Sequence, residues 1–279
     1  MDPSSAALAL AFGWSVLAGA LMASGAGGGG VLAGIGHLSI LGINDPNQVK
    51  VLNQILEFSS RIVSVPLYVR QRRVVASLAL CYGIGAPLGA VIGAWFSKRY
   101  LGEPATYRLA FGVLVTLVAA RTLYEAWATR AARPRTDEAP RTVRFGWDAA
   151  TVRYGTETFE FRPLMAAAGG FVIGCVGSAL GVGGGFLATP FMASVLAFPM
   201  MLVAGTSVVA LMLPLAVSVA TYLLLEVRVD WTLVAIEVPG VWIGSFLAPL
   251  LVGRLDERRL KAFVGSVLFL LGVYYLGSG

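Results

Sequence analysis

Long hydrophobic stretches alternate with short polar ones along almost the whole chain. A helix that crosses the hydrocarbon core of a bilayer needs about 20 mostly apolar residues, and eight stretches come close to that length. Two further apolar pieces, 31–43 and 186–198, are too short to cross and fit re-entrant or interrupted helices. We therefore expect an all-α polytopic membrane protein with segments at 5–24, 49–69, 74–96, 107–128, 163–180, 200–225, 231–252 and 260–276.

The composition excludes most soluble classes of protein. Of the 279 residues, 57% are hydrophobic and 13% are charged, whereas a soluble domain carries roughly 25% charged residues. A soluble enzyme, a disordered chain and a nucleic-acid binder are therefore excluded, and the net charge of +6 reflects membrane topology rather than an acidic partner. Cys81 and Cys175 lie in apolar stretches without metal-ligand spacing, so we expect no disulfide framework, no metal and no cofactor.

The second pattern is an internal repeat with an offset of 155 residues. Residues 28–33 match residues 183–188, and Gly19 and Gly89 match Gly174 and Gly244 at the same offset. Near the repeat ends the offset drifts to 153, where Arg108 and Gly112 meet Lys261 and Gly265. We expect two homologous four-segment halves, 1–128 and 163–279, joined by a polar linker at 129–162, as in many secondary transporters.

The glycine runs in the two halves predict a central site. Adjacent glycines break a helix, and a broken backbone at membrane depth is tolerated only where it is buried in protein or lines a watery cavity. Helix starts at such breaks offer free N–H groups and a positive dipole end to an anion. The alternative is that the glycines only permit tight helix packing, but their shared offset favours a site at mid-membrane made by Gly28, Gly29, Gly30, Gly183, Gly184 and Gly185.

The residues around both runs resemble the TauE/SafE sulfite exporter family. The pattern is Ser24-Gly25-Ala26-Gly27-Gly28-Gly29 in the first half, Gly-Val-Gly-Gly-Gly-Phe-Leu-Ala-Thr-Pro at 181–190 in the second, and then Ala204-Gly205-Thr206-Ser207. The first half departs from the pattern, with Ile35 at the place of Pro190 and Leu52-Asn53 at the place of Thr206-Ser207. The resemblance covers nearly the whole chain and implies export of sulfite or a small organosulfur anion across the bacterial inner membrane without ATP.

Segment 49–69 carries polar residues at membrane depth. Asn53, Glu57 and Arg61 are each four residues apart and share one helix face, and ionisable residues inside a span are functional candidates. Glu57 and Arg61 form either a self-neutralised structural pair or an anion site in which Glu57 couples transport to a proton. Because a planar guanidinium suits an oxyanion, we predict that Arg61 lines the site with the glycine runs, Asn53, Thr206 and Ser207.

Two more ionisable residues lie in apolar pieces. His37, the chain's one histidine, follows the first glycine run and has either a structural role or a role with substrate or proton. Glu57 and His37 are therefore the coupling candidates. Glu237 lies about two turns into segment 231–252, and its role stays open.

The linker indicates how the chain is oriented in the membrane. It holds seven arginines and five acidic residues, which predicts a cytoplasmic location. With eight crossings both termini would also be cytoplasmic, whereas a glycine-broken unit that does not cross fully would turn the halves into inverted repeats. Residues 142–161 alternate as in a small β-hairpin, with a solvated tether as the alternative.

The leading function is an ion-coupled secondary transporter that exports sulfite or a related anion, and the alternative is a channel or carrier for another small anion. An intramembrane protease fits poorly, because Met22 stands where such a motif has a glycine before Ser24. The expected partners are a small oxyanion and the lipid bilayer, without nucleic acid, and assembly into a homo-oligomer is left open.

Overall fold

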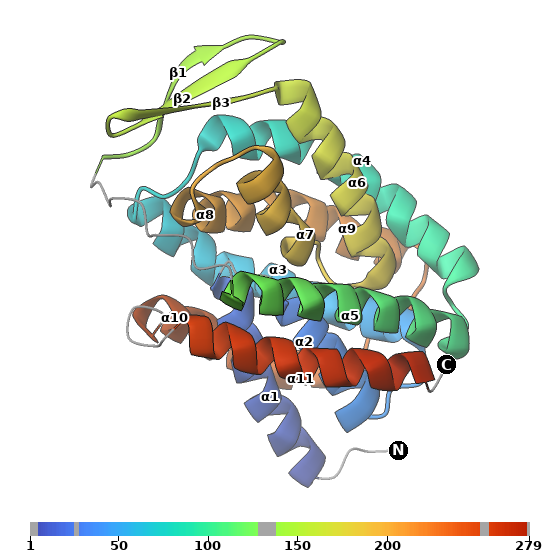
Figure 1. Cartoon of the computed structure of the whole chain (residues 1–279). Coiled ribbons are helices and arrows are strands. Elements are labelled where there is room, and N and C mark those ends of the chain that lie inside the picture. The colour runs from blue at the N-terminus through green and yellow to red at the C-terminus, as the bar shows by residue number, and fades with distance from the viewer. Residues whose placement is uncertain (1–4, 25–27, 128–137, 252–256, 278–279) are drawn as a thin grey trace.

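The computed structural model describes residues 5–24, 28–127, 138–251 and 257–277 (Figure 1). Helices before the linker are α1 (Ser5–Ala23), α2 (Gly29–Ile35), the π-helix η1 (Gly36–Ile40), α3 (Pro46–Arg70), α4 (Ala76–Tyr100) and α5 (Pro104–Trp127). Helices after it are α6 (Pro163–Leu180), α7 (Gly185–Pro190), the π-helix η2 (Phe191–Val195), α8 (Met200–Ala210), α9 (Met212–Leu224), α10 (Trp231–Leu251) and α11 (Glu257–Gly277).

The helices have the lengths of a membrane protein. Within the described ranges, five helical stretches are long and apolar enough to cross a bilayer: Ala76–Tyr100, Pro104–Tyr124, Pro163–Leu180, Met200–Leu224, which combines α8 and α9, and Trp231–Ala248. Shorter apolar helices include Gly29–Ile40 and Gly185–Val195, about 18 Å and 16 Å of helix at 1.5 Å per residue. The prediction of a mostly helical polytopic membrane protein is confirmed.

Each glycine run leads into a short helix. Gly28 precedes α2 with φ +97°, and Gly184 precedes α7 with φ +77°, so each turn uses the left-handed region that favours glycine. In the first half the chain then folds back along α1: Gly29 lies against Met22, and Gly36 against Trp14. The second half makes the same contacts 155 residues later, with Gly184 against Gly177 and Phe191 against Gly169.

The longer helices also pair across the halves in a reciprocal way. Helix α1 packs along α10, and α6 packs along α4. At the glycine contacts of these pairs the backbones lie so close that a methyl group would overlap the neighbouring helix. The contacts repeat at the offset of 155: Gly240 meets Phe12 and Gly244 meets Val16, while Gly85 meets Ala167 and Gly89 meets Phe171.

Helices α5 and α11 lie side by side and run in opposite directions (Figure 1). Gly112 on α5 lies against Tyr275 and Leu276, and Gly265 on α11 lies against Leu123. As the residue number rises on one helix it falls on the other, so the pair is antiparallel.

Segment 200–225 differs from the single helix expected. It consists of α8 and α9 with an interruption at Leu211. Pro214 explains the interruption, because proline has no N–H to donate to the carbonyl of Ala210, four residues earlier.

The linker contains the one sheet in the described part of the chain, so the all-α prediction is wrong there. Strands β1 (Arg141–Phe145), β2 (Ala150–Tyr154) and β3 (Glu157–Phe161) pair antiparallel in that order, one strand more than the hairpin considered from the sequence. The sheet contacts the rest of the protein at two places. Phe159 stacks on Phe198 in the loop before α8, with ring centroids 5.6 Å apart, and Thr142 Oγ1 donates to Ser77 Oγ of α4 across 2.8 Å.

Candidate functional site

One face of α3 carries a buried row of polar side chains. Asn53, Glu57 and Arg61 lie at successive turns, and their exposed fractions are 0%, 3% and 3%. Charged groups removed from water need compensating partners. The contacts of each residue therefore indicate what the row can do.

Glu57 lies between the two glycine turns. The backbone N–H of Gly30 donates to its carboxylate. A Cβ atom on Gly30 would overlap Glu57 Oε1, and one on Gly183, where φ is +64°, would overlap Oε2. Glycine is required at both positions because the backbones of both halves come this close to a single carboxylate.

Arg61 joins the carboxylate to the end of α1. One terminal nitrogen, Nη2, donates to Glu57 Oε2 across 3.1 Å, and the other, Nη1, donates to the carbonyl oxygen of Met22 across 2.7 Å. That carbonyl lies in the last turn of α1, where carbonyls lack helical partners and a cation is favourable. The third nitrogen, Nε, is buried without a hydrogen-bond partner in the described structure.

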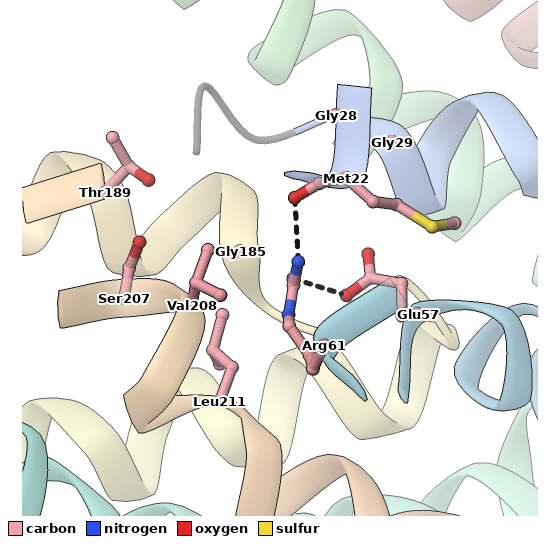
Figure 2. Close-up of a pocket in the computed structure, with 10 residues that line it drawn as sticks. All are labelled: Met22, Gly28, Gly29, Glu57, Arg61, Gly185, Thr189, Ser207, Val208 and Leu211. Atoms are coloured by element: carbon pink, nitrogen blue, oxygen red, sulfur yellow. Dashed lines mark hydrogen bonds and ion pairs between the residues drawn. The ribbon is translucent and has the colours of Figure 1, made fainter. Parts of the chain in front are cut away.

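A small pocket opens beside this pair, between the α2 start and the α7–α8 region (Figure 2). Glu57 and Arg61 form one side, and Thr189 and Ser207 lie on the other. Water can occupy about 10 Å³ of it, which is about the space that one water molecule needs. The pocket is lined by Met22, Gly28, Gly29, Glu57, Arg61, Gly185, Thr189, Ser207, Val208 and Leu211.

The structure brings six of the predicted site residues to this pocket: Gly28, Gly29, Glu57, Arg61, Gly185 and Ser207. Gly30 and Gly183 lie outside the lining and are in close contact with the Glu57 carboxylate. Gly184 packs near Ile173 and Leu211. Thr206 lies outside the lining and accepts a hydrogen bond from the Val75 N–H across 3.0 Å.

Asn53 and His37 lie outside the pocket lining, in a second buried polar group. His37 Nδ1 is 2.5 Å from Asn53 Oδ1, and His37 Nε2 is 3.0 Å from Glu237 Oε2. The amide nitrogen of Asn53 is buried without a partner in the described structure. Glu237, left open from the sequence, is therefore the partner of His37 across 200 residues.

Four residues of the pocket were not predicted from the sequence: Met22, Thr189, Val208 and Leu211. Thr189 belongs to the Thr-Pro pair of the second glycine motif, and this motif was the available signal. Met22 contributes through its backbone carbonyl, which no side-chain pattern reveals. Leu211 and Val208 look like any other apolar residues of a membrane helix.

Comparison with known proteins identifies the family. The chain is 25% identical to the "Probable membrane transporter protein YunE" of Bacillus subtilis (strain 168) over 212 residues, which cover 76% of this chain and 74% of that protein. No solved structure matches. The family model described as "Sulfite exporter TauE/SafE" matches residues 11–275. The protein is therefore a multi-pass inner-membrane transporter that belongs to the TauE/SafE sulfite exporter family.

Proposed function

We propose that the protein exports sulfite or a related small organosulfur anion, and that the anion binds at Arg61 between the two glycine turns. The observation that carries this proposal is the buried guanidinium beside a pocket lined by both halves. Its Nε–H has no partner in the described structure, and an unpaired buried donor is costly. An oxyanion would supply the missing acceptor.

Glu57 acts in this proposal as the internal counter-ion of Arg61. It neutralises the guanidinium across 3.1 Å while no anion is bound, and an entering anion competes with it for the same donors. The pocket has room for about one water molecule, so a sulfite ion enters only when the walls move apart. Movement of α7 and α8 away from α3 would open it, since these elements carry the opposite wall.

We further propose that the two halves are inverted repeats. The reciprocal pairing of α1 with α10 and of α6 with α4 supports a two-fold relation between them. The corresponding helices α5 and α11 contact each other and run antiparallel. This favours a two-fold axis in the membrane plane. In this arrangement each half contributes a hairpin that enters and returns, followed by three crossings, which is compatible with alternating access around a central site.

The distribution of basic residues supports this topology. If each hairpin returns to the side it entered, both termini lie on the side opposite to the linker. The linker side then holds 14 basic residues: Arg70, Arg72, Arg73, the seven linker arginines, Arg254, Arg258, Arg259 and Lys261. The other side has five: Lys50, Lys98, Arg99, Arg108 and Arg228. This bias supports a cytoplasmic location for the linker.

Transport is coupled to an ion in this proposal, and Glu57 and His37 are the two groups considered from the sequence. Glu57 is held by Arg61 and by the Gly30 N–H. His37 faces a second carboxylate at 3.0 Å.

Sulfite efflux from proteoliposomes tests the proposed function. Arg61→Ala is expected to abolish transport, and Arg61→Lys to restore little of it, because lysine lacks the planar fork. Arg70→Ala is the matched control, because Arg70 lies on the same helix and is exposed. Native efflux by Arg61→Ala, or no sulfite efflux by the unmodified protein, would overturn the proposal.

A further inference from the structure

A histidine and a carboxylate from opposite halves meet in the interior. His37 on η1 is 1% exposed and Glu237 on α10 is 3% exposed, and Nε2 lies 3.0 Å from Oε2. Asn53 on α3 holds the other ring nitrogen, with Oδ1 2.5 Å from Nδ1. The three residues come from three separate helices, so their meeting is a property of the assembled fold.

The geometry indicates how many protons this group holds. With the Asn53 oxygen facing Nδ1, Nδ1 must carry a proton to donate, because an amide oxygen only accepts. A neutral imidazole then has a bare Nε2, and a carboxylate oxygen is also an acceptor. A hydrogen bond between Nε2 and Oε2 therefore requires one further proton, on the ring or on the carboxyl group.

We propose that His37 and Glu237 form a one-proton site, and that this proton is the ion coupled to transport. The coupling of this proton to transport rests on the proposed function, whereas the proton site itself does not. With the proton bound, the pair is neutral overall, either as imidazolium and carboxylate or as imidazole and carboxylic acid. Without it, a carboxylate is buried with no countercharge, which is unfavourable.

Loss of the proton therefore favours a conformation in which Glu237 reaches water. The pair bridges η1 in the first hairpin to α10, so separating the two groups loosens the hairpin from α10.

The proton site is mechanically connected to the anion pocket through α2 and α3. Asn53 precedes Glu57 by four residues, about 6 Å along the helix. Gly34 lies over Asn53, where a Cβ would be 2.9 Å from Nδ2, and Gly30 lies over Glu57. A shift of α2 would therefore change the contacts of Asn53 and of Glu57 together.

The other charged or titratable groups near this network have their own contacts. Arg61 pairs with Glu57, the ammonium of Lys50 donates to the carbonyl of Leu101, and the Tyr107 hydroxyl donates to Leu180. On α11 the Tyr275 hydroxyl lies 2.5 Å from Ser39 Oγ, and Arg108 of α5 interacts electrostatically with Tyr275. Helix α1 carries no charged residue.

The first test compares proton and sulfite movement in proteoliposomes with a pH-sensitive dye in the lumen. The unmodified protein is expected to move protons with sulfite and to respond to an imposed pH gradient. Glu237→Gln and His37→Gln should keep sulfite–sulfite exchange but lose proton movement and the response to the gradient. Glu160→Gln, at an exposed position on β3, is the control. Proton-coupled flux in Glu237→Gln would overturn the inference.

The second test needs no transport. The chain has one histidine, so ¹⁵N-histidine labelling, with a purification tag free of histidine, reports on His37 alone by NMR. The ring signals are expected to titrate differently in the unmodified protein and in Glu237→Gln. Identical titrations would overturn the proton site. If the unmodified protein carried no sulfite, the proposed function would fail, and this spectrum would still decide for or against the site.

Discussion

The two hairpins that meet at the pocket have the same shape and different chemistry. In the first, Trp14 of α1 packs on Gly36, and in the second, Gly169 of α6 packs on Phe191. The large and the small partner have exchanged places while the contact is kept. Close backbone contact is thus a requirement in both halves, whereas the particular side chains are not.

The charged groups of the pocket, in contrast, belong to the first half. In the register that matches Leu52-Asn53 with Thr206-Ser207, the second half has Leu211 and Leu215 at the places of Glu57 and Arg61. At the offset of 155, His37 corresponds to Met192 and Glu237 to Tyr82. The comparison teaches that both halves build the cavity, while one row on α3 supplies its charge.

The largest expected effect comes from making the first half resemble the second. Glu57→Leu alone leaves Arg61 buried without its counter-ion and should lower the free energy of unfolding by about 3–5 kcal/mol. Adding Arg61→Leu removes the unpaired charge and should restore most of that stability, because apolar replacements of buried pairs are often neutral. Both variants should lose sulfite transport.

Unfolding in detergent micelles and efflux from proteoliposomes measure these two outcomes. Transport by the double variant would show that the charge is dispensable. Equal instability of the single and double variants would show that the unpaired Arg61 charge is not what destabilises Glu57→Leu.

A smaller effect is expected from single methyl groups in the glycine turns. Gly183→Ala places a residue at φ +64°, which costs about 1–2 kcal/mol, and also pushes its Cβ into the Glu57 carboxylate. Gly28→Ala adds φ strain without a contact to Glu57, because no atom of the described residues lies within 4 Å of its Cβ position. Sulfite efflux should therefore fall much further in Gly183→Ala.

The exposed α1 residue Gly13 gives the control, since Gly13→Ala meets no neighbour and alanine favours a helix by up to about 1 kcal/mol. Equal loss of efflux in Gly28→Ala and Gly183→Ala would contradict the role assigned to Glu57.

The smallest expected effect is a coupling energy within the first hairpin. Gly36→Phe should clash with Trp14, and Trp14→Gly should leave a gap, whereas the double variant copies the Gly169–Phe191 contact. A double-mutant cycle on unfolding in micelles should give a favourable coupling of about 0.5–3 kcal/mol. Simple additivity would mean that the two hairpins are not equivalent in their packing.

The features that depend on local sequence pattern were predicted from the sequence. Hydrophobic length predicted the membrane helices, and adjacent glycines predicted the breaks before α2 and α7. The four-residue spacing predicted that Asn53, Glu57 and Arg61 share a face. The interruption at Leu211 was missed, although Pro214 marked it, because a proline in a membrane helix does not always break it.

The remaining features depend on contacts between distant parts of the chain. Nothing near Glu237 in the sequence points to His37, 200 residues away. Asn53 was expected at the anion, yet its oxygen is occupied by His37. Thr206 was expected there too, yet its hydroxyl oxygen accepts from the Val75 N–H. Such assignments need the tertiary fold, since helical spacing fixes only which face a residue lies on.

The most direct test of the central claim is an experimental structure with the anion bound, using sulfite and its heavier analogue selenite. We predict that the anion lies between the turn at Gly28 and Gly29 and the start of α7 at Gly185. It should be within hydrogen-bond distance of the Arg61 guanidinium, with the Glu57 carboxylate displaced from its present contact. An anion that touches neither glycine turn nor Arg61 would contradict it.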